Sequence, residues 1–527
     1  MLKYLLVSLV CTSAFGGVLV KEVISPDRKT TIKEVLHTTK NVIQPTIIRD
    51  LPMYMGEKDF NSSENYRETI YPDSTLDFFI QDKKDESIKF TGNEVRTIIN
   101  QGPDANRIVL TILGDGYTEA EKEKFFEDAK FMVDDLFVGA TFRSYLPFFN
   151  IYAVFVPSKD SGITDKTKKN TAFGLYRSPA GSKRAIMPGN NRAIESALEL
   201  APTANYPIIL ANDDFYGGLG GRYAITTRAR VSGPIVLRHE LGHNFSNVGE
   251  EYDDGQAYMG ANFSASGTGK WDYWRETSTL EKHNSKYVFG AYVWQELSRP
   301  FIQDFKTDES SALFSVKISS VGWEREGDIE ILLDGTSLKL AGLYTRDRSF
   351  FETEPFAIRP GKHQLVIRSN GNNPKHVLAF ADGFSYPADY DFHSGEVKAF
   401  NVFSEGQRMV GYRPTENKCL MRDMLSKVFC VVDQENIWLQ FLMRVSLIDG
   451  LIKNASGDIE LKTIGFDKSN LEITWFRGQQ ELMELRGQTT VPKKFDATTV
   501  RVKLITPEIR AQSPYIIDEK KVPLDFL

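Results

Sequence analysis

The chain has 527 residues, which is too long for one ordinary hydrophobic core, so we expect two to four domains. Hydrophobic residues make up 41% of the sequence and charged residues 25%, which excludes a disordered or fibrous chain. The 64 Lys and Arg and the 70 Asp and Glu give a net charge of −6. This mild negative charge argues against a nucleic-acid partner or an anionic-membrane surface, since both require a basic patch.

The first 16 residues have the pattern of a secretory signal peptide. Lys3 precedes a short apolar run, and the small residues Ala14 and Gly16 follow. The apolar run is shorter than the roughly 20 residues that span a bilayer, so we expect no stable membrane insertion. The sequence therefore predicts cleavage after Gly16 and a secreted protein, extracellular or periplasmic.

Two cysteines remain once Cys11 is removed with the signal peptide. Cys419 and Cys430 lie eleven positions apart in a chain that we expect to be exported. In an oxidising compartment such a pair favours a disulfide that closes a short loop. Two buried free thiols are the alternative.

The order of predicted elements divides the chain into a catalytic domain and β modules. Residues 17–104 carry short β-like runs and form an N-terminal β-rich region. A sharper pattern follows: an amphipathic helix begins at Thr118, and continuous apolar strands are predicted at 107–113, 149–156 and 206–211. Strands alternating with helices are typical of an α/β domain.

Two later segments change to short alternating strands with turn residues about every ten positions. Residues 312–395 are predicted to be an inserted β-sandwich module, and residues 455–527 a C-terminal β module. The catalytic domain then comprises 105–311 and 396–454. The modules could bind substrate, a glycan or the extracellular matrix, or they could be structural support.

The segment from Gly233 to Phe245 contains the strongest chemical signal. Its residues His239-Glu240-Leu241-Gly242-His243 fall in a predicted helix, so the two imidazoles face the same side one turn apart. Neutral imidazoles bind Zn²⁺ without cancelling its charge, and Glu240 is placed to activate the metal-bound water as a general base. We expect one Zn²⁺ per chain. The alternative is two histidines on a helix surface, but the chain has only seven histidines in total.

A third ligand is expected just after this helix. Gly249 is a suitable left-handed C-cap that reverses the chain, and Glu250, Glu251 and Tyr252 follow it. Adjacent carboxylates point in different directions after a turn, so one of them binds the metal. The sequence favours Glu251, with Glu250 as the alternative.

At this point the chain resembles the zinc metallopeptidases of the immunoglobulin-A peptidase family. The resemblance covers roughly residues 105–255 and 400–440, and it rests on several separated motifs in order. They are Ile-Leu-Gly-Asp-Gly-Tyr-Thr at 112–118, the strand 149–158, the loop from Tyr216, HELGHNFSNVGEEY at 239–252, Gly-Tyr-Arg-Pro at 411–414, and Asn-Lys-Cys-Leu-Met-Arg at 417–422. The chain departs from the family pattern at Glu250, where Asp is usual, and at Ser246, where Gly is usual.

The resemblance implies an α/β (α+β) metzincin-like catalytic domain, to which the all-β sandwich modules are added. It also implies a methionine turn below the metal, for which Met421 is the candidate. Tyr252 or Tyr412 could donate a hydrogen bond to the oxyanion of the transition state. Asp115, between two glycines, is either a fixed turn or a carboxylate behind the metal ligands.

The sequence therefore predicts a secreted zinc endopeptidase that hydrolyses peptide bonds of extracellular proteins. One alternative keeps the metal but hydrolyses another amide or ester. The other is a secreted adhesion protein that binds matrix or glycan and carries a relic peptidase domain. An intact His-Glu-x-x-His set argues against the relic.

Overall fold

The structure is a computed structural model of the whole chain. It describes the strand segments 17–24, 30–38 and 65–72, and then residues 88–178, 184–202, 205–255, 258–277, 279–392, 395–404, 406–416 and 419–526. The predicted signal peptide, residues 1–16, lies outside the described residues. The N-terminal strands β1 (Gly17–Ile24), β2 (Thr30–Thr38) and β3 (Asn65–Pro72) form an antiparallel sheet in the order β2-β1-β3.

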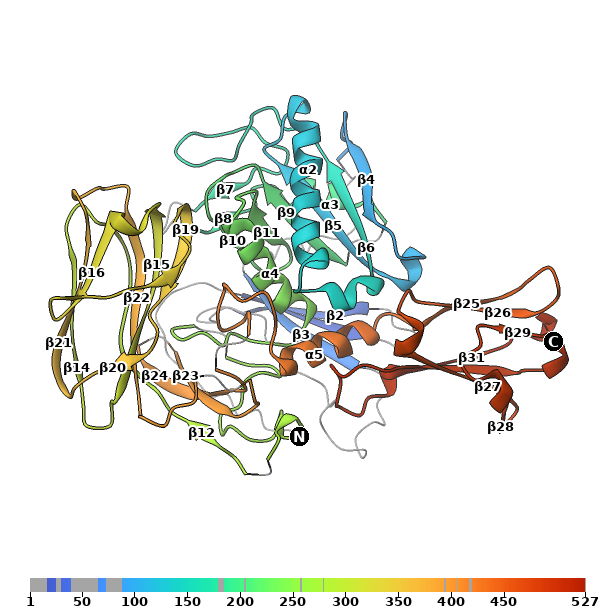
Figure 1. The fold of residues 1–527 in the computed structure, drawn as a ribbon. Coiled ribbons are helices and arrows are strands. Elements are labelled where there is room, and N and C mark those ends of the chain that lie inside the picture. Colours follow the sequence, from blue (N-terminus) through green and yellow to red (C-terminus); the bar gives the residue numbers. More distant parts are fainter. Residues whose placement is uncertain are drawn as a thin grey trace.

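A six-stranded sheet forms the centre of the catalytic part (Figure 1). Its strands are β4 (Glu94–Ile99), β5 (Ile108–Asp115), β6 (Phe149–Phe155), β9 (Tyr206–Ala211), β10 (Gly218–Leu219) and β11 (Ala224–Thr227). The order is β10-β11-β9-β5-β6-β4, with the four inner strands parallel and the two edge strands antiparallel to their neighbours. The continuous apolar runs in the sequence are the inner strands, because a parallel strand is buried on both faces.

Helices cover both faces of this sheet. Alternation along β5 sends Ile112 into one core and Leu113 into the other. The first core also receives α2 (Lys122–Val133), α4 (Ser232–Phe245) and α5 (Val431–Leu442), and the second receives α3 (Asn191–Leu198). A capping box between Thr118 and Glu121 starts the turn that leads into α2, as the sequence predicted.

Two packed antiparallel sheets form the inserted module. One has the path β13-β22-β15-β19-β18 with β20 paired to β15, and the other has the order β14-β21-β16-β17. Their bounds are β13 (Lys286–Glu296), β14 (Phe301–Thr307), β15 (Leu313–Trp323), β16 (Ile329–Leu333), β17 (Thr336–Ser337), β18 (Ala341–Gly342), β19 (Thr345–Glu352), β20 (Phe356–Ala357), β21 (Gly361–Ser369) and β22 (Val377–Tyr386). The sandwich thus begins at Lys286, earlier than the expected 312, because β13 and β14 pair with β22 and β21.

Smaller sheets complete the fold. Strand β12 (Lys282–His283) pairs with β23 (Ala399–Ser404), which pairs with β24 (Arg408–Arg413). A two-stranded sheet joins β7 (Tyr176–Arg177) to β8 (Ile186–Met187). The C-terminal sheets contain β25 (Ile448–Lys453), β26 (Ile459–Thr463), β27 (Leu471–Arg477), β28 (Gln480–Glu481), β29 (Thr490–Val491), β30 (Thr499–Leu504) and β31 (Ile517–Lys521). The whole is a mixed α+β fold with β modules, the broad class that the sequence indicated.

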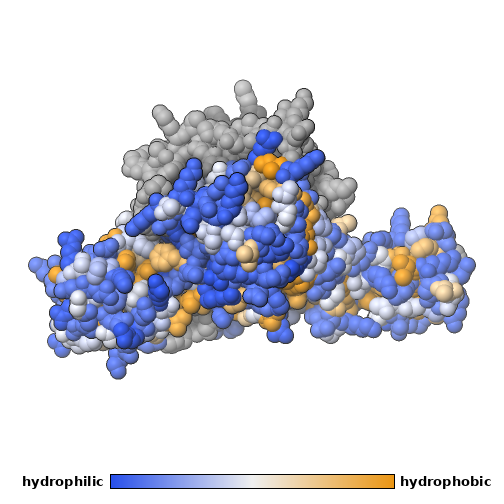
Figure 2. All heavy atoms as spheres, turned by 90° about the horizontal axis from the view of Figure 1, so that it is seen from above, coloured by the Kyte–Doolittle hydropathy of each residue, from blue (hydrophilic) through white to orange (hydrophobic). Residues whose placement is uncertain are grey.

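The face drawn in Figure 2 is mostly hydrophilic, with small separate hydrophobic patches. Among the described residues, no helix has the length and apolar character needed to cross a membrane.

An acidic side chain of the inserted module caps the helix of the catalytic motif. The Asp347 carboxylate, on β19, accepts hydrogen bonds from the backbone N–H of Ser232 at 3.1 Å and of Tyr216 at 2.9 Å. Ser232 is the first residue of α4, and no side chain at the preceding Val231 caps that end. The neighbouring Arg348 guanidinium stacks 4.3 Å from the Tyr216 ring centroid. The module therefore supplies the anion that the helix N-terminus attracts.

We expect Asp347→Ala to lower the free energy of unfolding by about 1 kcal/mol, because two backbone N–H groups lose their acceptor. In a domain of this size that corresponds to a fall of about 2–4 °C in the thermal midpoint. The control is Glu309→Gln, an exposed acid on a turn of the same module. Equal midpoints for both variants in a thermal unfolding scan would contradict the capping role.

Candidate metal centre

Helix α4 is buried on nearly all of its sides, which fixes the direction of its few polar side chains. Leu237, Leu241 and Phe245 pack into the first core. A helix that is apolar all round is stable only inside a protein, where neighbouring elements determine its position. His239 and His243 project from this fixed helix one turn apart, with ring centroids 4.9 Å apart and planes at 88°.

Glu250 completes a three-residue cluster with the two histidines. Its carboxylate oxygens lie 3.2 Å from His239 Nε2 and 3.3 Å from His243 Nε2. The side chains of these residues are at most 17% exposed. Although burial alone would raise it, the two imidazoles hold the pKa of Glu250 well below its usual range. The cluster therefore brings two ring nitrogens and an anionic carboxylate together, with one ligand atom from each residue within 4.8 Å of the others.

The spacing of these donor atoms fits a tetrahedral zinc ion. Two nitrogen or oxygen ligands each about 2.1 Å from a tetrahedral Zn²⁺ are about 3.4 Å apart, close to the separations in this cluster. His243 Nδ1 lies 3.0 Å from the Val248 carbonyl oxygen, a contact that places the proton on Nδ1 and leaves the Nε2 lone pair free. Nδ1 of His239 is buried without a hydrogen-bond partner. Two histidines and one glutamate are a catalytic zinc ligand set, in which a fourth position stays open.

The preference for Glu251 as the third ligand does not fit this geometry, because Glu251 points the other way. Its N–H donates to the Met421 carbonyl at 3.0 Å, and its carboxylate accepts a hydrogen bond from Asn262 Nδ2 at 3.0 Å. These contacts turn Glu251 towards Cys419 and Cys430. The alternative ligand from the sequence, Glu250, is the one beside the imidazoles.

The chain reversal after α4 also differs from the expectation. The helix ends at Phe245, with Ser246 in an extended conformation as its C-cap, and Gly249 does not take a positive φ. The side chain of Asn262 holds the reversed segment, since it accepts from Gly249 N–H at 2.8 Å and donates to the Gly249 carbonyl at 3.0 Å. The hydrogen bonds of the Asn262 side chain therefore stabilise the chain reversal that was expected from a left-handed Gly249.

Glu240 lies beside the histidines and close to the glycine-rich loop of residues 216–221. A Cβ added at Gly220 would be 2.1 Å from Glu240 Oε2, so only glycine leaves room for this carboxylate. Burial raises the pKa of the Glu240 carboxyl, although His239 and His243 oppose the shift. A carboxylate whose pKa is raised is a better proton acceptor, which is what a general base requires.

Met421 packs directly beneath the metal helix. A Cβ at Gly242, the neighbour of His243, would lie 3.0 Å from Met421 Sδ and 2.9 Å from the ring of Phe429. Both residues are buried. Met421 therefore packs against α4 next to His243, and its role as a methionine turn stays a prediction.

The remaining candidates separate into one residue at the site and two away from it. The Tyr252 ring centroid lies 6.0 Å from that of His239, and Tyr252 lines the adjacent cavity. Tyr412 is buried with Lys282 4.8 Å above its ring, and its described contacts do not include the cluster. Asp115 accepts three hydrogen bonds of 2.8–2.9 Å from residues 171–175, so it fixes a turn.

The predicted disulfide is not formed in the structure. Cys419 and Cys430 are both free and buried. Their sulfur atoms instead lie close to two carboxyl groups, with Cys419 Sγ 2.9 Å from Asp433 Oδ2 and Cys430 Sγ 3.9 Å from Glu251 Oε1.

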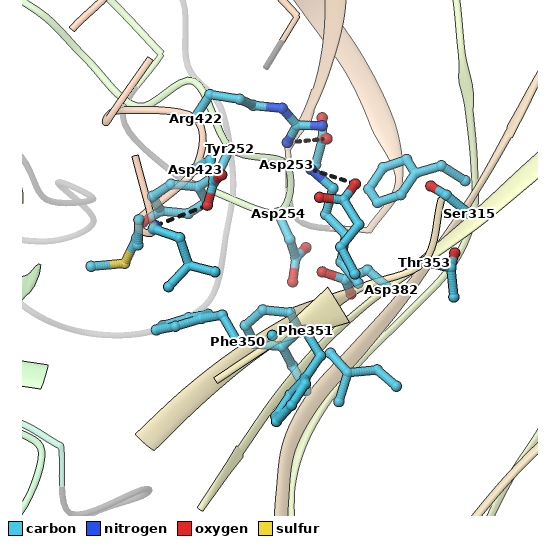
Figure 3. A pocket seen from close by; sticks show the side chains of 18 of the residues that line it. Tyr252, Asp253, Asp254, Ser315, Phe350, Phe351, Thr353, Asp382, Arg422 and Asp423 are labelled. Atoms are coloured by element: carbon cyan, nitrogen blue, oxygen red, sulfur yellow. Dashed lines mark hydrogen bonds and ion pairs between the residues drawn. The ribbon is translucent and has the colours of Figure 1, made fainter. Parts of the chain in front are cut away.

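A cavity of 810 Å³ opens beside the metal cluster, and the inserted module forms its far wall (Figure 3). Tyr252 and Asp254 of the catalytic part face Phe350, Phe351 and Asp382 of the module. The loop after Met421 closes one end, where Arg422 pairs with Asp253 at 2.7 Å. A volume of this size accommodates several side chains of a bound peptide.

Three residues at this site, Asn262, Asp347 and Arg184, could not be identified from the sequence. Asn262 holds the segment around Glu250, Asp347 caps α4, and Arg184 lines the cavity. Asn262 lies ten positions after the motif at 239–252, but its spacing from that motif does not indicate a role in the site. The other two are placed by contacts between distant segments.

Three comparisons with known proteins were informative to different degrees. Curated proteins gave no significant match. Among solved structures, the cycloisomaltooligosaccharide glucanotransferase of a Paenibacillus species, complexed with cycloisomaltoheptaose, is 8% identical over 62% of this chain and 45% of that chain, with a TM-score of 0.12. So low a TM-score carries no argument about fold or function.

The model of the family described as IgA peptidase M64 matches residues 97–299. The matched residues include most of the central sheet, all of α4, and all three members of the His239, His243 and Glu250 cluster. Over these residues the chain is similar to the IgA peptidase M64 family, and this match supports the family resemblance that the sequence motifs indicated.

Proposed function

We propose that this protein is a secreted zinc-dependent endopeptidase with a metzincin-like catalytic domain. The observation that carries the proposal is the convergence of His239, His243 and Glu250 at tetrahedral spacing, with Glu240 beside them and an open cavity in front. Secretion is supported by the signal-peptide pattern of the first 16 residues.

A bound zinc ion would polarise the scissile carbonyl and acidify the attacking water. Glu240 accepts the proton of that water at its carboxylate and returns it to the leaving amine. The phenol of Tyr252, at the cavity wall next to His239, donates a hydrogen bond to the developing oxyanion. Gly220 holds the loop close above Glu240, which excludes bulk water from the base.

The inserted module supplies the substrate contacts on the far side of the cavity. Phe350 offers apolar surface there, and Asp382 offers a carboxyl group. A peptide in the cavity would contact the metal cluster on one side and the module on the other. This arrangement favours an extended protein substrate over a small ester.

We expect Glu240→Gln to reduce kcat by at least about 10²-fold with little loss of bound metal, because the amide keeps the shape of the side chain but accepts no proton. The measurement is cleavage of denatured casein with metal content determined in parallel. Glu127→Gln, an exposed change on α2, is the control and should behave as wild type. Survival of cleavage in Glu240→Gln would refute the base assignment.

We expect Glu250→Gln to raise the zinc concentration that half-restores cleavage to chelator-treated enzyme by at least about 100-fold, because a neutral amide replaces the anionic ligand. The control is Glu354→Gln, which removes an exposed acid at the rim of the same cavity. An unchanged zinc requirement for Glu250→Gln would remove this residue from the ligand set.

We expect Phe350→Ala to raise KM about fivefold at nearly constant kcat, since about 1 kcal/mol of apolar contact with substrate is lost away from the reacting bond. The comparison is Ile302→Ala, which shortens an exposed apolar side chain on β14, in the module's other sheet. Equal KM values for the two variants on a peptide substrate would show that the module wall does not contact substrate.

A further inference from the structure

A second cluster of potential metal ligands lies on the far side of the Glu250-Glu251 peptide unit. Glu251, Cys419, Cys430 and Asp433 each offer one ligand atom, and these four atoms lie within 4.8 Å of one another. All four residues are at most 4% exposed. The three chain segments that contribute them are the segment after α4, the loop that carries Met421, and the first turn of α5.

Two oxygen atoms in this cluster are buried and have no hydrogen-bond partner. They are Glu251 Oε2 and Asp433 Oδ1. Burying a carboxylate oxygen without a partner is costly, so native proteins pair such atoms with a donor or a cation. Among the described residues neither carboxyl forms an ion pair with Lys or Arg, and the nearby Arg413 pairs with Glu416 instead.

The donor set and its spacing fit a structural zinc-type ion. Zinc accepts both cysteine sulfur and carboxylate oxygen, and closed four-ligand sites are structural. In a tetrahedral site a sulfur and an oxygen ligand would be about 3.6 Å apart, given bond lengths of about 2.3 and 2.1 Å. The sulfur–oxygen separations of 2.9 and 3.9 Å bracket this value. Asn262 already orients Glu251 through its hydrogen bond of 3.0 Å.

We propose that Glu251, Cys419, Cys430 and Asp433 form a second, structural divalent-metal site of the zinc class behind the His239, His243 and Glu250 centre. The ion would tie Glu251, and with it the adjacent ligand Glu250, to the Met421 loop and to α5. The expected metal content then rises from one ion per chain to two. The rival arrangement is a disulfide between the two cysteines, which leaves two facing carboxyl groups.

The test uses the full purified chain, with zinc replaced by cobalt. We expect two equivalents of cobalt and an intense near-ultraviolet thiolate-to-cobalt band, because only the second site contains sulfur. Glu250→Gln should lose the equivalent held at the histidine centre, and with it cleavage when no further metal is added, but keep the band. Cys430→Ser should lose the band and one equivalent while retaining metal at the histidine centre.

Two outcomes would overturn the second site. A denatured, unreduced wild-type chain that is two hydrogen masses lighter than the reduced chain would show a disulfide in place of the site. One equivalent of cobalt without the band, with both thiols free, would show an unmetallated cluster. Both results come from the wild-type protein, so they hold even if Cys430→Ser fails to fold. Failure of the proposed peptidase function would appear separately, as absent cleavage with the band intact.

Discussion

The whole catalytic arrangement depends on the contact between one carboxylate and two imidazoles, His239 and His243, held one helical turn apart. Helix α4 can hold these rings only because it is buried on almost every side, and Glu250 reaches them only because the chain turns back directly after Phe245. The neighbouring elements stabilise either the buried position of α4 or the chain reversal that follows it. The sheet and α5 hold the helix, and Asn262 with the Met421 loop holds the turn.

Much of the centre could be predicted because its signal is local. The four-residue spacing of the histidines places them on one helix face whatever the rest of the chain does, and Glu240 follows from its position next to His239. The choice between Glu250 and Glu251 could not be made in this way. Adjacent side chains point in opposite directions, and what decides between them is a hydrogen bond to Met421, 170 positions later in the chain.

The same division between local and distant contacts separates the predicted parts of the fold from the unpredicted ones. The apolar runs of β5, β6 and β9 and the capping box before α2 are visible in short windows. The start of the sandwich is not visible in a short window of sequence, because β13 joins the sandwich only by pairing with β22, about 90 residues further along the chain. The cysteine pair shows the same limit, since spacing favoured a disulfide while the structure places two carboxyl groups beside the sulfurs.

The position of Asp347 has a consequence for how such a protein could evolve. Its carboxylate belongs to the sandwich but accepts a hydrogen bond from the first backbone N–H of α4. Removal of the inserted module by recombination would therefore also remove a contact that stabilises the catalytic helix. Deleting the module, or exchanging it for a foreign sandwich, would leave the start of the catalytic helix without its acceptor. A replacement that brought an oxygen atom to that same point would keep the stabilisation of about 1 kcal/mol that the cap provides.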